Sequence, residues 1–357
     1  MGPSPLRYGI IGAGMMGGEH ALDLARLPGA EVVALADPVA ASLEWTTACL
    51  GHEVATYGDH RGLLERDDLD AVVIATPNDT HRSILDDVLA TDLAVMVEKP
   101  LCTTVADCRH VQELARGRRA VTWVGLEYRY IPVVAALLEQ VRSGVTGTTR
   151  MVSIREHRFP FLVKVGDWNR FNARTGGTLV EKCCHFFDLM RLIAQAEPVR
   201  VMASGGQAVN HLDERYDGRV PDILDHAYVI VEFANGVRGS LDLSMFAEGG
   251  RHEQELCVVG DSAKVEAAFP GADVVWVGPR DRSGPIEVAA PTPAEVPYPE
   301  LHGGASYLEH VAFARCVREH RPAEVSVSDG LWSVAMGVAA HRSIDEGRII
   351  DMEEVLT

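Results

Sequence analysis

The ten residues YGIIGAGMMG, positions 8–17, decide how this chain is interpreted. Tyr8–Ile11 is short, apolar and β-prone, and the GxGxxG pattern that follows opens a helix-like segment. In this pattern the first glycine permits a tight turn, the second lets a pyrophosphate approach the backbone, and the third lets helix and strand pack closely. Free N–H groups and the helix dipole then favour an anion at this point. The candidate cofactor-binding residues here are Gly12, Gly14, Met15, Met16 and Gly17.

Strand-like and helix-like segments keep alternating up to about Gly125. Besides Tyr8–Ile11, apolar runs predict strands at Glu31–Ala36, Ala71–Ala75, Ala94–Val97 and Val121–Gly125. Helical periodicity occurs at Met16–Leu27, Ala41–Leu50, His81–Ala90 and Thr104–Arg116. Continuous apolar strands separated by helices indicate a parallel sheet covered on both faces. We therefore expect an α/β fold, with a doubly wound Rossmann-type domain in residues 1–126.

The remaining residues, 127–357, predict an α+β domain with a largely antiparallel open sheet. Strand-like segments follow at Met151–Arg158, Val199–Val209, His226–Phe233, Val237–Met245, Glu255–Val259, Ala263–Phe269 and Val274–Val277. The sequence Ala234-Asn235-Gly236 is a hairpin signal. Helices are expected at Pro132–Arg142, Thr178–Gln195, Tyr307–His320 and Gly330–Asp345, and an exposed loop at Gly278–Tyr298.

Polar residues that follow the parallel strands complete the predicted cofactor site. Asp37 ends the second strand, 20 residues after Gly17, where a carboxylate can accept hydrogen bonds from ribose hydroxyls. The alternative is that Asp37-Pro38 simply begins a turn. No Arg or Lys lies between Asp37 and Glu44 to neutralise a 2′-phosphate, which favours NAD over NADP. Thr76, Pro77 and Asn78 follow the third strand at its carboxyl end, where doubly wound sheets bind their ligands.

Two further segments carry candidate catalytic groups. Glu98-Lys99-Pro100 ends an apolar strand, so Lys99 is expected to point into the ligand crevice. If Thr178 begins a helix, Glu181 and His185 lie one turn apart and share a face, which suits proton transfer. The alternative is a surface Glu–His pair on an amphipathic helix.

Glycines and cysteines flank this second segment. The preceding Gly176-Gly177 allows the close approach of a ligand or another backbone, which favours the functional interpretation of Glu181 and His185. Cys183 and Cys184 are assigned to packing rather than to a metal, because adjacent cysteines do not easily face one ion.

These motifs resemble the glucose–fructose oxidoreductase / inositol dehydrogenase (Gfo/Idh/MocA) family. The similarity covers nearly the whole chain: the Gly12–Gly17 turn, Ala75-Thr76-Pro77-Asn78 with His81, Glu98-Lys99-Pro100, Gly176-Gly177 with Glu181 and His185, and Arg342-Ser343-Ile344 with Glu346-Gly347. The family's usual pattern has Asp where Glu181 stands and Gly where Cys183 stands, and both departures leave the exact substrate open.

The resemblance implies a role for each matching residue. Lys99 would polarise the reacting hydroxyl, His185 would act as general acid or base, and Glu181 would position His185 and the substrate. Glu98 would contact the cofactor ribose, and His81 belongs to the expected cofactor-binding set. The reaction implied is hydride transfer between NAD(P) and a secondary alcohol of a sugar or cyclitol.

Further candidates for substrate binding lie near the expected domain junction and beyond it. They are Arg129, Tyr130, Arg155, His157, Trp168, Arg170 and Asn172. Trp168 is as readily explained as a core residue.

Two other functions are compatible with the same predicted cofactor site and candidate catalytic residues. In one, transient oxidation acidifies a neighbouring C–H so that a glycosidic bond can be eliminated and NAD is recycled. In the other, the protein is a non-catalytic NAD-binding sensor, but a sensor needs neither Lys99 nor His185.

Composition limits the partners. The net charge of −18 disfavours nucleic acid and membrane surfaces. The seven cysteines without a CxxC pair are expected to be reduced thiols, and no metal site is predicted. Met1–Pro5 does not begin a signal peptide, and no apolar stretch is long enough to span a bilayer, so we expect a cytoplasmic protein. The expected helices suffice to cover only one face of the antiparallel sheet, which predicts a homodimer or homotetramer.

Overall fold

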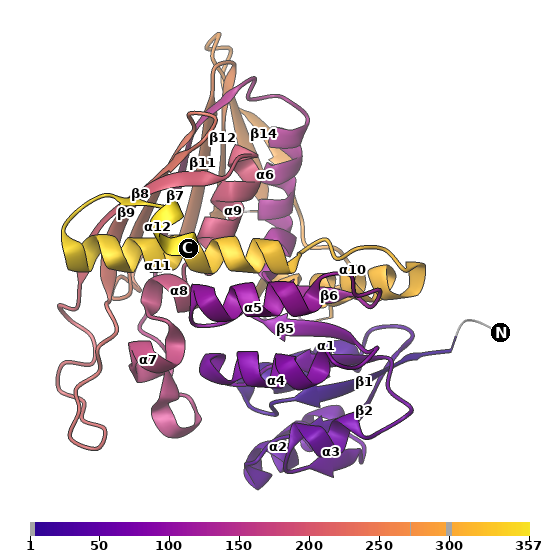
Figure 1. Cartoon of the computed structure of the whole chain (residues 1–357). Coiled ribbons are helices and arrows are strands. Elements are labelled where there is room, and N and C mark those ends of the chain that lie inside the picture. The colour runs from indigo at the N-terminus through magenta and orange to yellow at the C-terminus, as the bar shows by residue number, and fades with distance from the viewer. Residues whose placement is uncertain (1–3, 272, 298–301) are drawn as a thin grey trace. The chain divides into compact units, whose positions relative to one another are not determined.

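The computed structural model describes residues 4–271, 273–297 and 302–357 (Figure 1). Contacts between Cα atoms divide the chain into two compact units. The first unit contains residues 1–127, 164–168 and 294–334, and the second contains residues 128–163, 169–293 and 335–357. Each unit therefore combines segments that are far apart in the sequence. The expected domain boundary at residue 126 stays a prediction.

Six parallel strands form the sheet of the first unit, within the described residues, in the order β3-β2-β1-β4-β5-β6. They are β1 (Leu6–Ile11), β2 (Ala30–Ala36), β3 (Ala55–Tyr57), β4 (Ala71–Ile74), β5 (Ala94–Glu98) and β6 (Thr122–Gly125). The predicted Rossmann-type sheet is confirmed, because β4 and β5 are buried along their whole length as expected for strands covered on both faces. Strand β3 was not predicted, since its three residues carry no apolar run.

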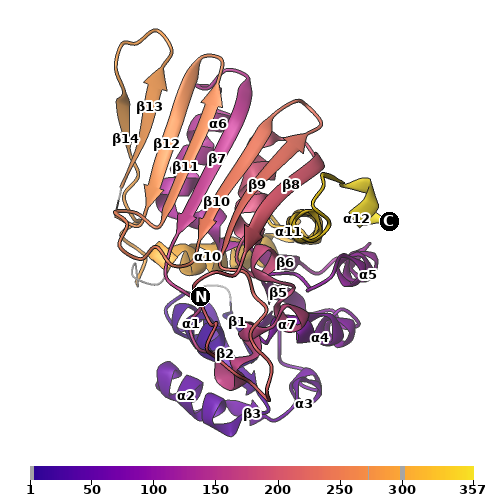
Figure 2. The ribbon, with the colours of Figure 1, turned by 90° about the vertical axis from the view of Figure 1, so that its left-hand side faces the viewer.

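Helices cover both faces of this sheet. Figure 2 shows α1 (Met15–Leu24), α2 (Ala40–Leu50) and α10 (Ala305–Glu319) on one side, and α3 (His60–Leu64), α4 (His81–Val88) and α5 (Val105–Ala115) on the other. Thr104 caps α5 by accepting a hydrogen bond from the N–H of Asp107. Helix α11 (Val327–Glu346) begins in the first unit and ends in the second.

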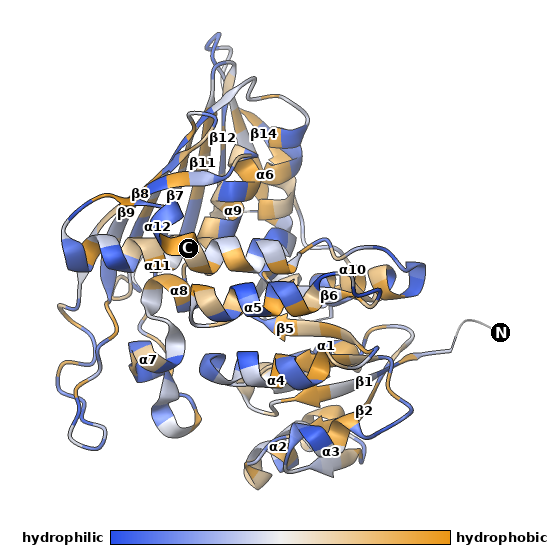
Figure 3. Cartoon of the chain, in the orientation of Figure 1, coloured by the Kyte–Doolittle hydropathy of each residue, from blue (hydrophilic) through white to orange (hydrophobic). Residues whose placement is uncertain are grey.

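The core of the first unit brings together segments from the first and the last third of the chain. The ring of Phe313 on α10 lies 6.3 Å from that of Tyr8 on β1 and 6.0 Å from that of Trp123 on β6. All three side chains are fully buried. Figure 3 shows the apolar character of the sheet around β5. Helix α10 therefore completes a core that begins 300 residues earlier in the sequence.

Within the described residues, nine strands form the sheet of the second unit, in the order β14-β13-β12-β11-β7-β10-β9-β8-β15. They are β7 (Thr149–His157), β8 (Pro198–Gly206), β9 (His226–Phe233), β10 (Arg238–Ser244), β11 (Gln254–Gly260), β12 (Ala263–Phe269), β13 (Val274–Pro279), β14 (Ile286–Ala289) and β15 (Ile350–Asp351). Only the β7–β10 pair among them is parallel, so the largely antiparallel sheet is confirmed.

The segment Gly278–Tyr298 was predicted as one loop, and this is wrong in part. Strand β13 extends to Pro279 and β14 lies within the segment, pairing with β13 from Ile286 to Ala289. Exposed edge strands bury little apolar surface, so their sequences give a weak signal. Tyr298 lies outside the described residues.

Alternating burial shows which face of the second sheet is packed. Buried and accessible residues alternate along β9 and β10. Helices α6 (Pro132–Arg142) and α9 (Cys184–Ala194) cover the packed face, and Figure 2 shows the opposite face. That opposite face carries exposed apolar side chains, among them Met151, Met202, Tyr228 and Ile230.

The predicted single helix Thr178–Gln195 is wrong, because the backbone is interrupted at Lys182 and Cys183. Helix α8 (Thr178–Glu181) ends there and α9 begins at Cys184, while a short α7 (Asn172–Thr175) precedes them. Gln195 has a left-handed backbone and ends α9. Lys182 at the interruption forms an ion pair with Glu156 on β7, an attraction that helical periodicity cannot reveal.

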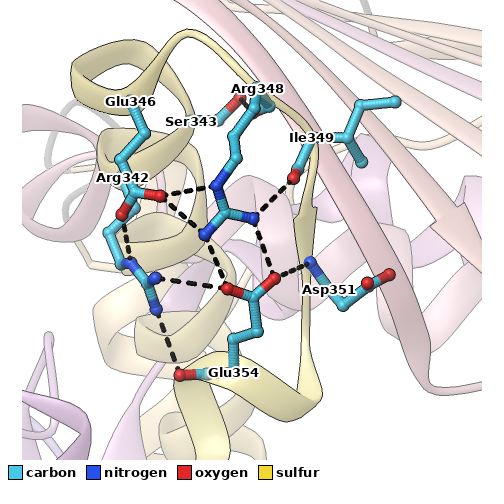
Figure 4. A network of polar contacts seen from close by, with 7 residues as sticks. All are labelled: Arg342, Ser343, Glu346, Arg348, Ile349, Asp351 and Glu354. Carbon is cyan, nitrogen blue, oxygen red and sulfur yellow. Dashed lines mark hydrogen bonds and ion pairs between the residues drawn. The ribbon is translucent and has the colours of Figure 1, made fainter.

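Ion pairs fasten the C-terminal segment (Figure 4). Arg348 contacts both Glu346, at 2.7 Å, and Glu354 on α12 (Glu353–Leu356), at 2.6 Å. Ser343 donates a hydrogen bond to the carbonyl of Arg348 and accepts one from the N–H of Ala203 on β8. These contacts hold β15 at the edge of the sheet. No helix in the described part of the chain is long and apolar enough to cross a membrane.

Candidate functional site

The glycine turn after β1 has the shape that a dinucleotide requires. A Cβ on Gly17 would lie 1.9 Å from the carbonyl oxygen of Gly12, and one on Gly12, whose φ is +94°, would lie 2.6 Å from that of Ala75. A Cβ on Gly14 would meet nothing within 4 Å. The backbone is thus tightly packed at Gly12 and Gly17 but open at Gly14. Gly14 also directly precedes α1, whose first N–H groups have no partner within the helix.

Asp37 at the end of β2 holds this turn. Its Oδ2 accepts a hydrogen bond from the N–H of Ala13 at 2.8 Å, and its Oδ1 accepts one from the N–H of Val39 at 2.7 Å. A carboxylate can accept about four hydrogen bonds. The carboxylate therefore keeps acceptor capacity for ribose hydroxyls while it shapes the loop.

His81 connects two strand ends at the same edge of the sheet. Its Nδ1 lies 2.9 Å from the carbonyl oxygen of Pro100 after β5, and its Nε2 lies 3.0 Å from that of Thr76 after β4. The ring is fully buried. Thr76 also accepts a hydrogen bond from the hydroxyl of Thr80, and Asn78 is buried in the turn between them. His81 thus fixes the segments that carry Pro77, Asn78 and Lys99.

A buried polar cluster lies behind Lys99. The Glu98 carboxylate accepts a hydrogen bond from the N–H of Lys99 at 3.0 Å and lies 3.0 Å from Nε2 of His20 on α1. Nδ1 of His20 lies 2.8 Å from Nε2 of His310 on α10. Neither histidine was singled out from the sequence. His20 could have been noticed as a polar residue on the apolar side of α1, but its contact with His310 spans 290 positions.

Proton affinities in this cluster are strongly shifted. Burial alone raises the pKa of Glu98, but the hydrogen bond and charge of His20, with Lys99, lower it to about 2. Burial opposes a charge on His20, yet the hydrogen bond and charge of Glu98 raise its pKa. Burial and the charge of His20 hold the pKa of His310 well below its usual value. A charged Glu98–His20 pair beside a neutral His310 accounts for these shifts.

His185 lies in the second unit, at the start of α9. Its imidazole stacks on the ring of Tyr128, with centroids 4.1 Å apart and planes 12° from parallel. His185 and Glu181 are 2% and 3% exposed, so the surface alternative for this pair is wrong. Burial raises the pKa of the neighbouring Cys183 thiol, and the Sγ of Cys184 donates to the carbonyl of Glu181. Both cysteines pack in the interior.

Gly177 makes room for a side chain of the same unit. Its φ is +90°, and a Cβ there would lie 2.3 Å from Nε2 of His341 on α11. That nitrogen accepts a hydrogen bond from the N–H of Leu179, at the start of α8. Burial lowers the pKa of His341 to about 4, so the ring is neutral and can accept at physiological pH. The group that approaches Gly177 is thus the side chain of His341, whereas the sequence suggested a ligand or another backbone.

Several candidate substrate-binding residues are occupied by intramolecular contacts. Arg129 forms a two-pronged ion pair with the buried Asp188 on α9, with Nε 2.6 Å from Oδ2. Arg170 is 2% exposed and bonded to Glu214, and Asn172 donates to the backbone and side chain of Asp222. These three residues therefore have structural partners within their own unit.

The other candidates lie in different surroundings. Arg155 pairs with Glu255, and His157 with Asp242, across neighbouring strands. Arg155 and His157 flank the buried Glu156 in β7, and neighbouring residues of a strand point to opposite faces. They therefore lie on the face opposite to the one that packs on α9. The structure does not bring them together with His185. Trp168 is buried under Lys164 in the first unit, and Tyr130 is half-buried beside Arg129 in the second.

A doubly wound sheet whose first turn carries this glycine pattern is typical of dinucleotide-binding enzymes. Comparison with family models agrees. Residues 6–126 match "Oxidoreductase family, NAD-binding Rossmann fold", and residues 138–352, more than half of the chain, match "Oxidoreductase family, C-terminal alpha/beta domain". The chain belongs to the Gfo/Idh/MocA oxidoreductase family and contains its NAD(P)-binding Rossmann domain.

Known relatives extend over most of the chain. It is 28% identical over 355 residues to the myo-inositol 2-dehydrogenase of Thermotoga maritima, covering 98% of this chain and 100% of the relative. It is 32% identical over 266 residues to the inositol 2-dehydrogenase of Acidothermus cellulolyticus, covering 74% and 73%. A crystal structure of a probable dehydrogenase from Thermotoga maritima superposes with a TM-score of 0.81 at 27% identity, covering 98% and 100%.

Proposed function

We propose that this protein is an NAD-dependent dehydrogenase that oxidises a secondary alcohol of a cyclitol or sugar, or catalyses the reverse reduction. The observation that carries the proposal is the position of Lys99. It follows β5 at the carboxyl edge of the parallel sheet, the same edge as the Gly12–Gly17 turn after β1. That edge is where such sheets bind their ligands. The inositol dehydrogenases among the relatives support a cyclitol substrate.

The open backbone at Gly14, the helix N-terminus and Asp37 fit a bound dinucleotide. Bound NAD would supply the ring that accepts the hydride. NAD is favoured over NADP because the Asp37 carboxylate would repel a 2′-phosphate, and Asp37–Glu44 contains no cation to offset it.

Lys99 and His185 divide the proton chemistry. The Lys99 ammonium stabilises the negative charge that develops on the substrate oxygen, and His185 accepts the hydroxyl proton. Glu181 positions the substrate and His185. Because His185 is buried against Tyr128, its ring orientation is restricted, which suits a positioned general base.

The test is a screen of inositols, sugars and glycosides for NADH or NADPH formation, followed by Lys99→Ala and His185→Ala. Each substitution should lower kcat about 10²–10⁴-fold, the usual contribution of acid–base groups, while NADH affinity stays nearly unchanged. Arg116→Ala and His52→Ala, at exposed positions of the first unit, serve as controls. An unchanged kcat in Lys99→Ala would refute the assignment. Turnover without accumulated NADH would instead indicate transient oxidation with elimination, and binding without any turnover a sensor.

We also propose that the accessible face of the second sheet contacts another copy of the chain in a homodimer or homotetramer. Tyr228 and Met151 on this face are 66% and 52% exposed. Met202 and Ile230 on the same face lie opposite each other on β8 and β9, and neighbouring exposed apolar side chains of this kind favour an interaction surface.

A further inference from the structure

A buried lysine lies close to His185. The Lys182 side chain, at the interruption between α8 and α9, is 7% exposed, and that of Glu156 on β7 is fully buried. The two groups are 3.1 Å apart. Lys182 Nζ also donates a hydrogen bond to the hydroxyl of Tyr128 at 2.6 Å. A buried charge is costly unless it is paired, so these contacts are expected to be maintained during turnover.

Tyr128 connects this ion pair to His185. Lys182 Nζ lies 4.8 Å from the centre of the Tyr128 ring, and the imidazole of His185 stacks on the same ring at 4.1 Å. Phe186 packs edge-on against this ring as well, at 5.7 Å. The ammonium is thus within about 9 Å of the imidazole. At this separation, between side chains that are all buried, a positive charge disfavours a second one on His185. An ammonium on the tyrosine hydroxyl also withdraws electron density from the ring that would stabilise an imidazolium.

We propose that Lys182 is a positioning residue that keeps His185 neutral and ready to accept a proton, and that Glu156 opposes this effect. The pair sets the proton affinity of His185, with Tyr128 fixing the geometry between them. This inference rests on the proposed function only in taking His185 as the general base. Lys182 itself does not contact the reacting atoms in this scheme.

Other charged groups surround His185 and must be considered. Glu181 ends α8, Asp188 on α9 is neutralised by Arg129, and Arg158 after β7 lies 3.7 Å from Glu156. Arg155 and His157 on β7 belong to the opposite face of the sheet, and Arg191 at the end of α9 pairs with Glu197. Substitution of Lys182 or Glu156 leaves these groups in place, and Arg158 stays beside Glu156 when Lys182 is replaced.

The experiment compares Lys182→Met with Glu156→Gln in the full-length protein. Lys182→Met removes the positive charge and should raise the midpoint of the acid limb of the kcat/KM–pH profile by about one pH unit. Glu156→Gln removes the negative charge and should lower the same midpoint by a similar amount. The double variant Lys182→Met/Glu156→Gln should return close to the wild-type midpoint. Loss of packing alone would not shift the two single variants in opposite directions.

A second readout does not require turnover. NMR titration of ¹³C-labelled histidines, with the His185 signal assigned from its absence in His185→Asn, should show the same opposite shifts. If no alcohol is oxidised, the proposed function fails while the titration still tests this inference. Unshifted midpoints, or shifts of the same sign, would overturn it. If Lys182→Met does not fold, Glu156→Gln decides alone, since it keeps the side-chain shape: a downward shift supports the inference and any other result rejects it.

Discussion

At the scale of single residues, Gly14 and Gly17 stand three positions apart in one turn but have different surroundings. An added methyl group at Gly17 would overlap the carbonyl of Gly12, whereas one at Gly14 would enter open space. Gly14 has φ −77°, which alanine adopts without strain. The two glycines therefore separate folding of the turn from access of the cofactor.

Alanine substitution should separate these roles. Gly17→Ala should destabilise the protein by about 1–3 kcal/mol, as overpacking does, and weaken NADH binding as a consequence. Gly14→Ala should leave the melting temperature unchanged but weaken NADH binding about tenfold or more, because the methyl group obstructs the pyrophosphate. Differential scanning calorimetry and NADH fluorescence titration measure the two effects. Equal losses of melting temperature in both variants would contradict the distinction.

At the scale of elements, the His20–Glu98–His310 cluster joins α1, β5 and α10, and its charges make stability depend on pH. The pKa of His310 in the folded protein is below its unfolded value of 6.5. Its contribution to the free energy of unfolding is therefore present above pH 6.5 and is lost as the pH falls. His20 has a raised pKa, so its contribution is present below pH 6.5 and is lost as the pH rises through the folded pKa. The contribution of Glu98 is present above pH 4.5 and is lost only as the pH falls toward about 2. Between pH 6.5 and 4.5, His310 alone of the three therefore changes stability.

His310→Gln should remove this dependence. Glutamine keeps an acceptor for His20 but does not titrate. Between pH 6 and 5, the free energy of unfolding should fall less steeply with pH in the variant than in the wild type. The two slopes should differ by about 1.4 kcal/mol per pH unit, the value for one proton. Urea unfolding of the full chain at several pH values measures the slope, with His52→Gln as the control at an exposed position. A slope identical to the wild type would show that His310 protonates in the folded state.

The local sequence pattern predicted the strands and helices well, but it did not predict the contacts between them. Strands such as β4 and β5 were predictable because burial on both faces leaves continuous apolar runs. The Gly12–Gly17 turn and Lys99 were predictable because each follows such a run. The break at Lys182, the approach of His341 to Gly177 and the pairing of His20 with His310 depend on residues distant in sequence. No local periodicity encodes those contacts.

At the scale of the whole molecule, the accessible sheet face gives a test of assembly. Ile230 on β9 is 42% exposed and lies opposite Met202 on β8. If a second copy covers this face, Ile230→Lys would bury an unpaired charge, costing about 3–5 kcal/mol and weakening association more than a hundredfold. Light scattering of Ile230→Lys at micromolar concentration should then show a monomer. The control variant Leu114→Lys, at an exposed position on α5, should keep the assembly mass of the wild type. A monomeric wild type would reject the proposed assembly.

The late position of α10 in the sequence has a consequence for synthesis on the ribosome. Strand β6 ends at Gly125, yet Phe313, which packs on Tyr8 and Trp123, is translated nearly 190 codons later. At 5–20 residues per second, the nascent first sheet waits about 10–40 s for the helix that covers it. During that interval its apolar rings are open to chaperones and to neighbouring nascent chains. A premature stop codon near residue 294 would therefore damage the N-terminal unit as well as the tail.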